Sequence, residues 1–284
     1  MPDAVPHRET TVALVLGGGG PVGITWLAGL THGLRAAGID LTRADRIIGT
    51  SAGAVVGSAI AAGTDLSTLL TPRPGSAVPP AAAPAHDYAV LLEITTLLRA
   101  GDQDRDLVLR RVGELALGAD TGEPAEHLKR IGALVDFAEW PDHDLLVTSI
   151  DIGSGALTAW TRNDAATLVQ ALAASTAVPG IFPPIEIAGR HYIDGGVRST
   201  INADLAAGYD AVVILEPLAH LYPRSRADRS LVAVREVTIA PDEIAVAAFG
   251  PDLFGEAALV PSYESGLRQA AAAAADLREF WPGA

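Results

Sequence analysis

The segment Gly-Thr-Ser-Ala-Gly at residues 49–53 places a serine hydroxyl where it could act as a nucleophile. An apolar run precedes the segment and small residues with helical character follow it, so Ser51 is expected at a sharp strand-to-helix turn, which exposes the hydroxyl. The N-terminus of that helix favours negative charge developing on a substrate. Ser51 is therefore a candidate nucleophile, with Gly49 and Gly53 allowing the tight turn. The alternative is a serine that only caps the helix between two packing glycines.

A glycine-rich segment, Gly-Gly-Gly-Gly-Pro-Val-Gly at residues 17–23, also suggests chemistry. Its backbone N–H groups are not shielded by side chains and can converge on an anion. One interpretation is a dinucleotide site, because residues 18–23 match G-x-G-x-x-G with Asp40 about 20 residues further on. That interpretation leaves Ser51 unused, and Asp40 precedes a strand rather than ending one. The second interpretation is that the glycines bind the oxyanion formed when Ser51 attacks an ester.

A serine nucleophile needs a base, and none of the seven histidines lies in a recognisable catalytic setting. Only His220 follows an acid in the order Ser, Asp, His of α/β-hydrolases. The acid that stands out is Asp194, which ends a short strand and is followed by two glycines, where the chain can turn close to another backbone. A water-poor pocket raises the proton affinity of a carboxylate, which can then accept a hydroxyl proton. Asp194 is the predicted base; the alternative is an Asp that only forms a turn.

The elements around these residues alternate between strands and helices. Strands are expected at 12–16, 46–48, 145–150, 157–161, around 192–193 and at 212–215, and helices at 24–37, from 52 to about 63, at 164–175 and at 263–280. Continuous apolar runs are typical of strands buried on both faces. The alternation predicts an α/β fold with a mostly parallel sheet covered by helices on both faces. No repeat or domain boundary is evident, so residues 1–284 are expected to form one domain.

Residues 71–118 are expected to differ from this pattern. Five prolines within 71–86 exclude a continuous helix or strand there. Helical periodicity returns between 87 and 118 and is interrupted by polar residues at 101–104. We expect a Pro-rich flap followed by a helical cap over the site, with ordinary surface helices as the alternative.

Composition excludes several classes of protein. The chain has 284 residues, 49% of them hydrophobic, and a formal net charge of −14, so it can bury a large core but repels nucleic acid and anionic lipid. The absence of cysteine excludes disulfides and thiolate metal sites and fits a cytoplasmic location. Residues 11–34 and 47–64 lack charges but are too rich in glycine or small residues for a membrane span, and no signal peptide is evident. We expect no nucleic acid partner, no transmembrane segment and at most peripheral membrane contact.

Taken in order, these motifs resemble those of the patatin-like phospholipase family. The matching segments are Leu-Gly-Gly-Gly-Gly-Pro-Val-Gly at 16–23, Gly-Thr-Ser-Ala-Gly at 49–53, Ala-Ser-Thr-Ala-Val-Pro-Gly-Ile-Phe-Pro-Pro at 174–184 and Asp-Gly-Gly at 194–196. The resemblance spans residues 12 to about 202, with fainter similarity at 250–266. Each motif alone is common, whereas the ordered set is specific.

The resemblance implies a three-layer α/β/α fold and a Ser51-Asp194 catalytic dyad, with no histidine, metal or cofactor. It also implies an oxyanion hole around Gly18, Gly19 and Gly20, and an acyl-enzyme that water hydrolyses. The family commonly has Arg or Lys where this chain has Val22, so a neutral lipid ester or carboxylic ester is expected as substrate rather than a phospholipid. The alternatives are a relative that binds lipid without cleaving it and a nucleotide-binding protein that uses residues 18–23.

Overall fold

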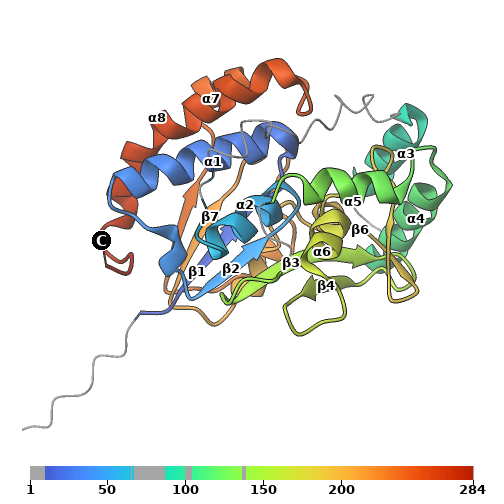
Figure 1. The fold of residues 1–284 in the computed structure, drawn as a ribbon, viewed down its shortest axis with the longest axis horizontal. Coiled ribbons are helices and arrows are strands. Elements are labelled where there is room, and N and C mark those ends of the chain that lie inside the picture. The colour runs from blue at the N-terminus through green and yellow to red at the C-terminus, as the bar shows by residue number, and fades with distance from the viewer. Residues whose placement is uncertain (1–9, 65, 67–86, 100–103, 136–138, 284) are drawn as a thin grey trace, which may run out of the picture.

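The computed structural model describes residues 10–64, 66, 87–99, 104–135 and 139–283, which form an eight-stranded sheet with helices around it (Figure 1). The strands are β1 (Val12–Leu16), β2 (Arg46–Gly49), β3 (Leu145–Asp151), β4 (Leu157–Trp160), β5 (Ile185–Ile187), β6 (Arg190–Asp194), β7 (Ala211–Leu215) and β8 (Arg235–Ile239). The helices are α1 (Gly20–Ala36), α2 (Ala52–Ala61), α3 (Tyr88–Arg99), α4 (Arg105–Gly118), α5 (Pro124–Gly132), α6 (Leu168–Ser175), α7 (Glu243–Phe249) and α8 (Leu259–Leu277). Short 3-10 segments include η1 (Leu41–Arg43), η3 (Gly195–Val197), η4 (Ala203–Ala206) and η5 (Asp228–Ser230).

The sheet has the strand order β5-β6-β3-β2-β1-β7-β8, with β4 paired to β3. The four pairs β1–β2, β1–β7, β2–β3 and β7–β8 are parallel. The three pairs β3–β4, β3–β6 and β5–β6 are antiparallel. The part of the sheet that carries the glycine-rich loop and the serine turn is therefore parallel, and an antiparallel part adjoins it at β3.

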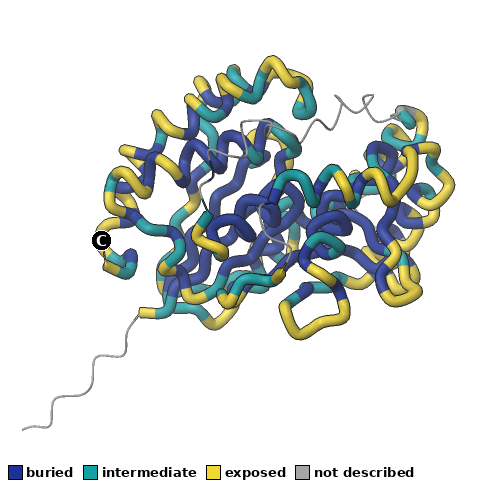
Figure 2. Tube along the Cα trace, in the orientation of Figure 1, coloured by how far each residue is buried: buried dark blue, intermediate teal, exposed yellow. Residues whose placement is uncertain are grey.

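Alternation along β3 shows which elements cover each face of the sheet. Leu145 and Val147 belong to the larger apolar core, which also contains residues of α1, α2, α6 and α8. Leu146 and Ile150 point to the opposite face, where they join smaller cores formed with η4 and with α3 and α4. Figure 2 shows the central strands buried between these layers. The predicted three-layer α/β/α fold is confirmed.

Most of the expected elements are present, and their boundaries differ for local reasons. Helix α1 begins at Gly20 rather than at residue 24. Pro21 is tolerated in its first turn because the N–H groups there make no hydrogen bond within the helix, so the N–H that proline lacks is not needed. Helix α6 begins at Leu168 rather than near residue 164, because Thr167 and Gln170 form a capping box. Four elements, α5, α7, β5 and β8, are not predicted from the sequence. Strand β5 has only three residues, and most residues of β8 alternate between half-buried and exposed.

The region predicted as a flap and cap is described only in part. Residues 71–86 lie outside the described residues, whereas α3 and α4 are present as the two expected helices. Leu109 and Val112 of α4 are buried against Ile150 of β3 and Ile193 of β6, beside Asp194. The role of these helices as a cap stays a prediction. None of the helices in the described part of the chain combines the length and the apolar character needed to cross a membrane.

Candidate active site

Ser51 lies at the turn between the end of β2 and the start of α2, as predicted. Its backbone has φ 54° and ψ −118°, a conformation that is strained for a residue with a side chain. The Ser51 side chain makes no capping hydrogen bond to α2, and its backbone N–H donates to Ser175 Oγ at 2.9 Å. Ser51 is therefore held in a strained turn by a residue of α6, and its hydroxyl remains available for another partner.

Gly49 and Gly53 are needed because β2, α2 and the end of β1 meet at close range. A Cβ atom on Gly53 would overlap the carbonyl oxygen of Leu16, and one on Gly49 would lie 2.5 Å from Ala54 Cα. Real Cβ atoms essentially never approach other atoms so closely. The two glycines bring the first turn of α2 against the sheet, which sets where the Ser51 hydroxyl points.

We expect Gly53→Ala to lower the unfolding free energy by about 3 kcal/mol or more, because the added methyl overpacks backbone that cannot move aside. Chemical denaturation with a fluorescence or circular dichroism readout measures the change. Gly118→Ala is the matched control, since a Cβ at this exposed position meets nothing within 4 Å. Equal stability of the two variants would contradict the close packing of α2 on β1.

Asp194 lies beside Ser51 because β2 and β6 both pair with the same edge of β3. Val147 of β3 pairs with Gly49 of β2, and two residues further along Ser149 pairs with Asp194 of β6. Strand β4 occupies the opposite edge of β3 at both positions. β2 and β6 therefore pair with successive parts of the same edge of β3. As a result, Ser51, which follows β2, lies next to Asp194 at the end of β6.

The Asp194 carboxylate is 3% exposed and accepts hydrogen bonds from the Ser51 hydroxyl and from the Gly196 N–H, the latter at 2.6 Å. Burial raises the pKa of Asp194 to about 7, and the two hydrogen bonds oppose this rise. A carboxyl group with a pKa near neutrality is a much better proton acceptor than an exposed aspartate. The structure thus brings together the two residues that the sequence analysis had paired.

The raised pKa of Asp194 predicts the pH dependence of any reaction in which it acts as a base. Only the ionised carboxylate accepts a proton, so we expect kcat/KM to be flat above about pH 7 and to fall about tenfold per pH unit below it. Initial rates with an uncharged ester between pH 5 and 9 measure the profile. A midpoint near 4, the ordinary pKa of an aspartate, would contradict this assignment.

The glycine-rich loop supplies backbone donors beside Ser51. A Cβ atom on Gly18 would lie 3.4 Å from Ser51 Cβ, so this loop adjoins the nucleophile. The Gly18 N–H, however, already donates to Thr200 O at 2.8 Å. Within the described residues no partner is present for the N–H of Gly19, of Gly20 or of Ala52, the first residue of α2. These three N–H groups therefore have no partner in the described part of the chain, whereas the Gly18 N–H has a structural contact, and the oxyanion hole stays a prediction.

The described histidines have their contacts elsewhere. His32 contacts Tyr263, His127 contacts Ala173 and Thr176, His143 contacts Thr42, His191 lies near Glu186, and His220 contacts Phe249 and Pro217. His7 and His86 lie outside the described residues. Among the residues described, no group of three or more His, Asp or Glu side chains is arranged to hold a metal ion. The serine therefore has Asp194 as its neighbour, and no described histidine.

Asp40 bears on the dinucleotide interpretation, and two residues around the site had no role predicted from the sequence. Asp40 accepts hydrogen bonds from Thr42 and caps η1 before β2 begins, which is not the strand-end position of a ribose-binding acid. Ser175 and Thr200, which hold the backbone of Ser51 and Gly18, had no assigned role. Ser175 lies in the matched segment at 174–184, which could have drawn attention to it, whereas Thr200 contributes only a backbone carbonyl, which any residue could supply.

Comparison with known proteins provides independent information on the family. Residues 93–207 match the family model described as "Patatin-like phospholipase", a segment that contains Asp194 but not Ser51. No curated protein sequence matches the chain.

Two solved structures are similar over most of the chain. VipD from Legionella pneumophila is 15% identical, with 95% of this chain and 67% of VipD covered and a TM-score of 0.42. The type III effector protein ExoU is 17% identical, with 94% of this chain and 53% of ExoU covered and a TM-score of 0.40. The chain therefore spans about two thirds of the first and about half of the second. The resemblance to the patatin-like phospholipase family is confirmed by the family match over residues 93–207.

Proposed function

We propose that this protein is a serine acyl-ester hydrolase that cleaves a lipid or lipid-like carboxylic ester. One observation carries the proposal: Ser51, in a strained turn, donates a hydrogen bond to a buried carboxylate whose pKa is raised to about 7. A nucleophile and a base in direct contact, beside backbone donors that have no partner among the described residues, are the components that acyl transfer requires. The family match supports a lipid ester as substrate.

The proposed reaction has two half-reactions. Asp194 takes the Ser51 proton while Ser51 Oγ bonds to the carbonyl carbon, and the resulting oxyanion accepts hydrogen bonds from the N–H groups of Gly19, Gly20 and Ala52. The intermediate collapses, and the alcohol leaves with the proton held by Asp194. Water then loses a proton to Asp194, attacks the acyl-enzyme and releases the acid, and Ser51 regains its proton.

Val22 supports a neutral ester over an anionic phospholipid. Its side chain is fully buried in the core between α1 and the sheet, so this position supplies packing and no positive charge. The net charge of −14 likewise disfavours anionic membranes. A catalytically inactive lipid-binding relative is the second candidate, motivated by the same residue.

Hydrolysis of a nitrophenyl ester series, from short to long acyl chains, tests the proposal. We expect the wild-type protein to turn over with an optimum at one chain length. Lipid binding without turnover of any ester in the series would favour the inactive relative. Saturable binding of a nicotinamide dinucleotide, with no acylation of Ser51, would instead support the nucleotide-binding alternative.

A further inference from the structure

A single turn, residues 199–202, contacts all three segments of the candidate active site. The first contact is the hydrogen bond from the Gly18 N–H to Thr200 O, 2.8 Å long, which ties the turn to the glycine-rich loop. The other two contacts come from the Asn202 side chain and involve the neighbours of Ser51 and of Asp194 in the sequence.

Asn202 connects the nucleophile turn with the loop that follows the base. Its Nδ2 donates to Thr50 Oγ1 at 3.1 Å and to Gly195 O at 3.3 Å. Thr50 immediately precedes Ser51, and Gly195 immediately follows Asp194. One planar amide therefore links the segment that carries Ser51 to the segment that carries Asp194.

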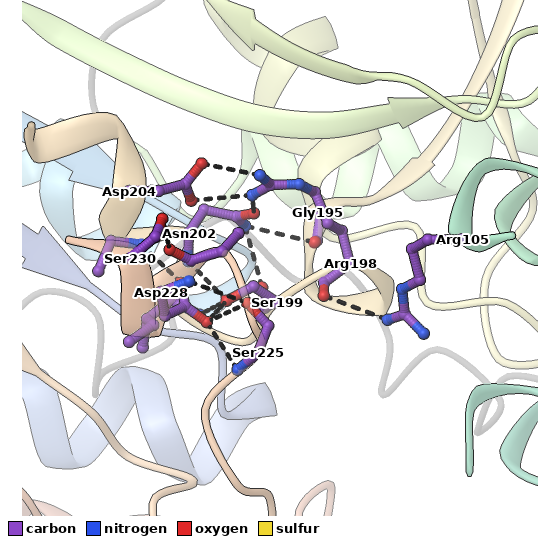
Figure 3. A network of polar contacts seen from close by, with 12 residues as sticks. Arg105, Gly195, Arg198, Ser199, Asn202, Asp204, Ser225, Asp228 and Ser230 are labelled. Atoms are coloured by element: carbon purple, nitrogen blue, oxygen red, sulfur yellow. Dashed lines mark hydrogen bonds and ion pairs between the residues drawn. The ribbon is translucent and has the colours of Figure 1, made fainter. Parts of the chain in front are cut away.

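The surroundings of Asn202 hold its side chain in one orientation (Figure 3). Asn202 is fully buried and has φ 51°, a left-handed conformation that Asn tolerates better than most residues. Its Oδ1 accepts a hydrogen bond from Arg198 Nη1 at 2.7 Å, and its Nδ2 also donates to Ser199 O at 2.9 Å. The amide is therefore fixed on both its oxygen and its nitrogen side.

The turn is itself anchored to a distant segment through a buried carboxylate. Asp228 of η5 is 2% exposed and accepts hydrogen bonds from Ser199 Oγ at 2.6 Å and from the Ala203 N–H at 2.9 Å. Ser225 Oγ donates to the same carboxylate at 2.6 Å. Figure 3 shows these contacts as parts of one network, which includes Gly195 and extends through Arg198 to Arg105. The position of Asn202 is thus determined independently of the Ser51-Asp194 contact.

We propose that Asn202 is a positioning residue that sets the distance and orientation between Ser51 and Asp194. The inference rests on the proposed function, because it assigns to Asn202 the alignment of that dyad. Asn202 touches neither the Ser51 hydroxyl nor the Asp194 carboxylate, and it acts through Thr50 and Gly195. Misplacement of a reacting group by about 1 Å can cost on the order of 100-fold in rate, so loosening this link is expected to slow the chemical step.

Two variants at position 202 test the proposal. Asn202→Asp keeps the size and the oxygen that Arg198 contacts but loses both Nδ2 donors, and Asn202→Gly tolerates the left-handed backbone without adding charge. We expect each to lower kcat about 10- to 100-fold with KM within about twofold. Asn163→Asp, the same chemical change at an exposed residue, is the control and should leave kcat unchanged.

A merely structural role and a positioning role predict different results. If Asn202 only supported folding, its loss would reduce the fraction of active protein but leave kcat per site, measured after titration with an acyl phosphonate, at the wild-type value. A positioning role lowers kcat per titrated site. It also weakens the Ser51 hydrogen bond that opposes the rise in the pKa of Asp194, so the pH midpoint of Asn202→Gly should move above that of wild type.

Thr50→Val completes the test through a double-variant cycle. This variant keeps the shape of the side chain but removes the hydroxyl that accepts from Asn202 and that also contacts Thr148 Oγ1 at 2.8 Å. If both residues act through their shared hydrogen bond, the combined variant should be slowed about as much as Asn202→Gly alone, whereas independent effects would multiply. Independent effects, or a kcat of both Asn202 variants within twofold of wild type, would overturn the proposal.

Hydrogen exchange separates failure of this inference from failure of the proposed function. The Gly18 N–H and the Ser51 N–H are hydrogen-bonded, and they report on the glycine-rich loop and the nucleophile turn. Faster exchange at both in Asn202→Gly, with unchanged exchange in α8, supports positioning even if wild type cleaves no ester. Unchanged exchange at both sites would refute it, whatever the activity of the wild-type protein.

Discussion

Ser51→Ala is expected to lower kcat for every ester that the wild-type protein cleaves by about four orders of magnitude or more. The reason is that an alanine at this position cannot form an acyl-enzyme, and the remaining donors and base lose the group on which they act together. The measurement is the initial rate with the best nitrophenyl ester. Intact-mass analysis after treatment with an acyl phosphonate adds a second readout, with one adduct on wild type and none on the variant.

The control for this experiment is Ser58→Ala. Ser58 is a fully buried serine of the same helix, α2, and its hydroxyl donates to Val55 O within that helix. We expect Ser58→Ala to retain near-wild-type activity per titrated site and to accept the phosphonate. Full activity of Ser51→Ala would remove the basis of the proposed function, while equal loss in both variants would point to damage of α2 rather than loss of a nucleophile.

Asp194→Asn is expected to have the second largest effect, a loss of about 100- to 10,000-fold in kcat, the usual range for removal of a general base. An amide has nearly the shape of the carboxylate and can still accept from the Gly196 N–H, but it cannot take the Ser51 proton. The remaining activity should also lose its pH midpoint near 7. A variant that kept the wild-type pH profile would show that another group is the base.

The same substitution is expected to stabilise the folded protein at alkaline pH. The folded pKa of Asp194 is raised from 3.8 to about 7, so between these values the folded state binds more protons than the unfolded state, and stability falls as pH rises. Asparagine cannot ionise, so the variant avoids this loss of unfolding free energy, which in the wild-type protein is on the order of a few kcal/mol above pH 7.

Urea denaturation at pH 5 and pH 8 measures the difference. We expect the unfolding free energy of Asp194→Asn to exceed that of wild type by more at pH 8 than at pH 5. An advantage that did not grow with pH would mean that burial does not raise the pKa of Asp194. The expected combination of lost activity and gained stability is typical of a charged group kept in a buried site for catalysis.

The sequence by itself determined the local features of this protein. Continuous apolar runs at residues 12–16 and 212–215 predicted β1 and β7, because a strand buried on both faces must be apolar throughout. The spacing of glycines around Ser51 predicted the turn, because only a residue without a side chain fits where α2 meets β1. Such features depend on neighbours in the chain, and a sequence records them directly.

Tertiary structure alone decided how these features combine. Ser51 and Asp194 are neighbours because β2 and β6 pair with successive parts of the same edge of β3. The hydrophobic periodicity of the sequence does not specify this strand register. The pKa of Asp194 is raised by burial among segments far apart in the sequence. Gly18 belongs to the predicted oxyanion segment, but only the structure shows that its N–H donates to Thr200 O, and no motif singles out Asn202. Contacts between distant segments depend on the completed packing, which local sequence patterns cannot specify.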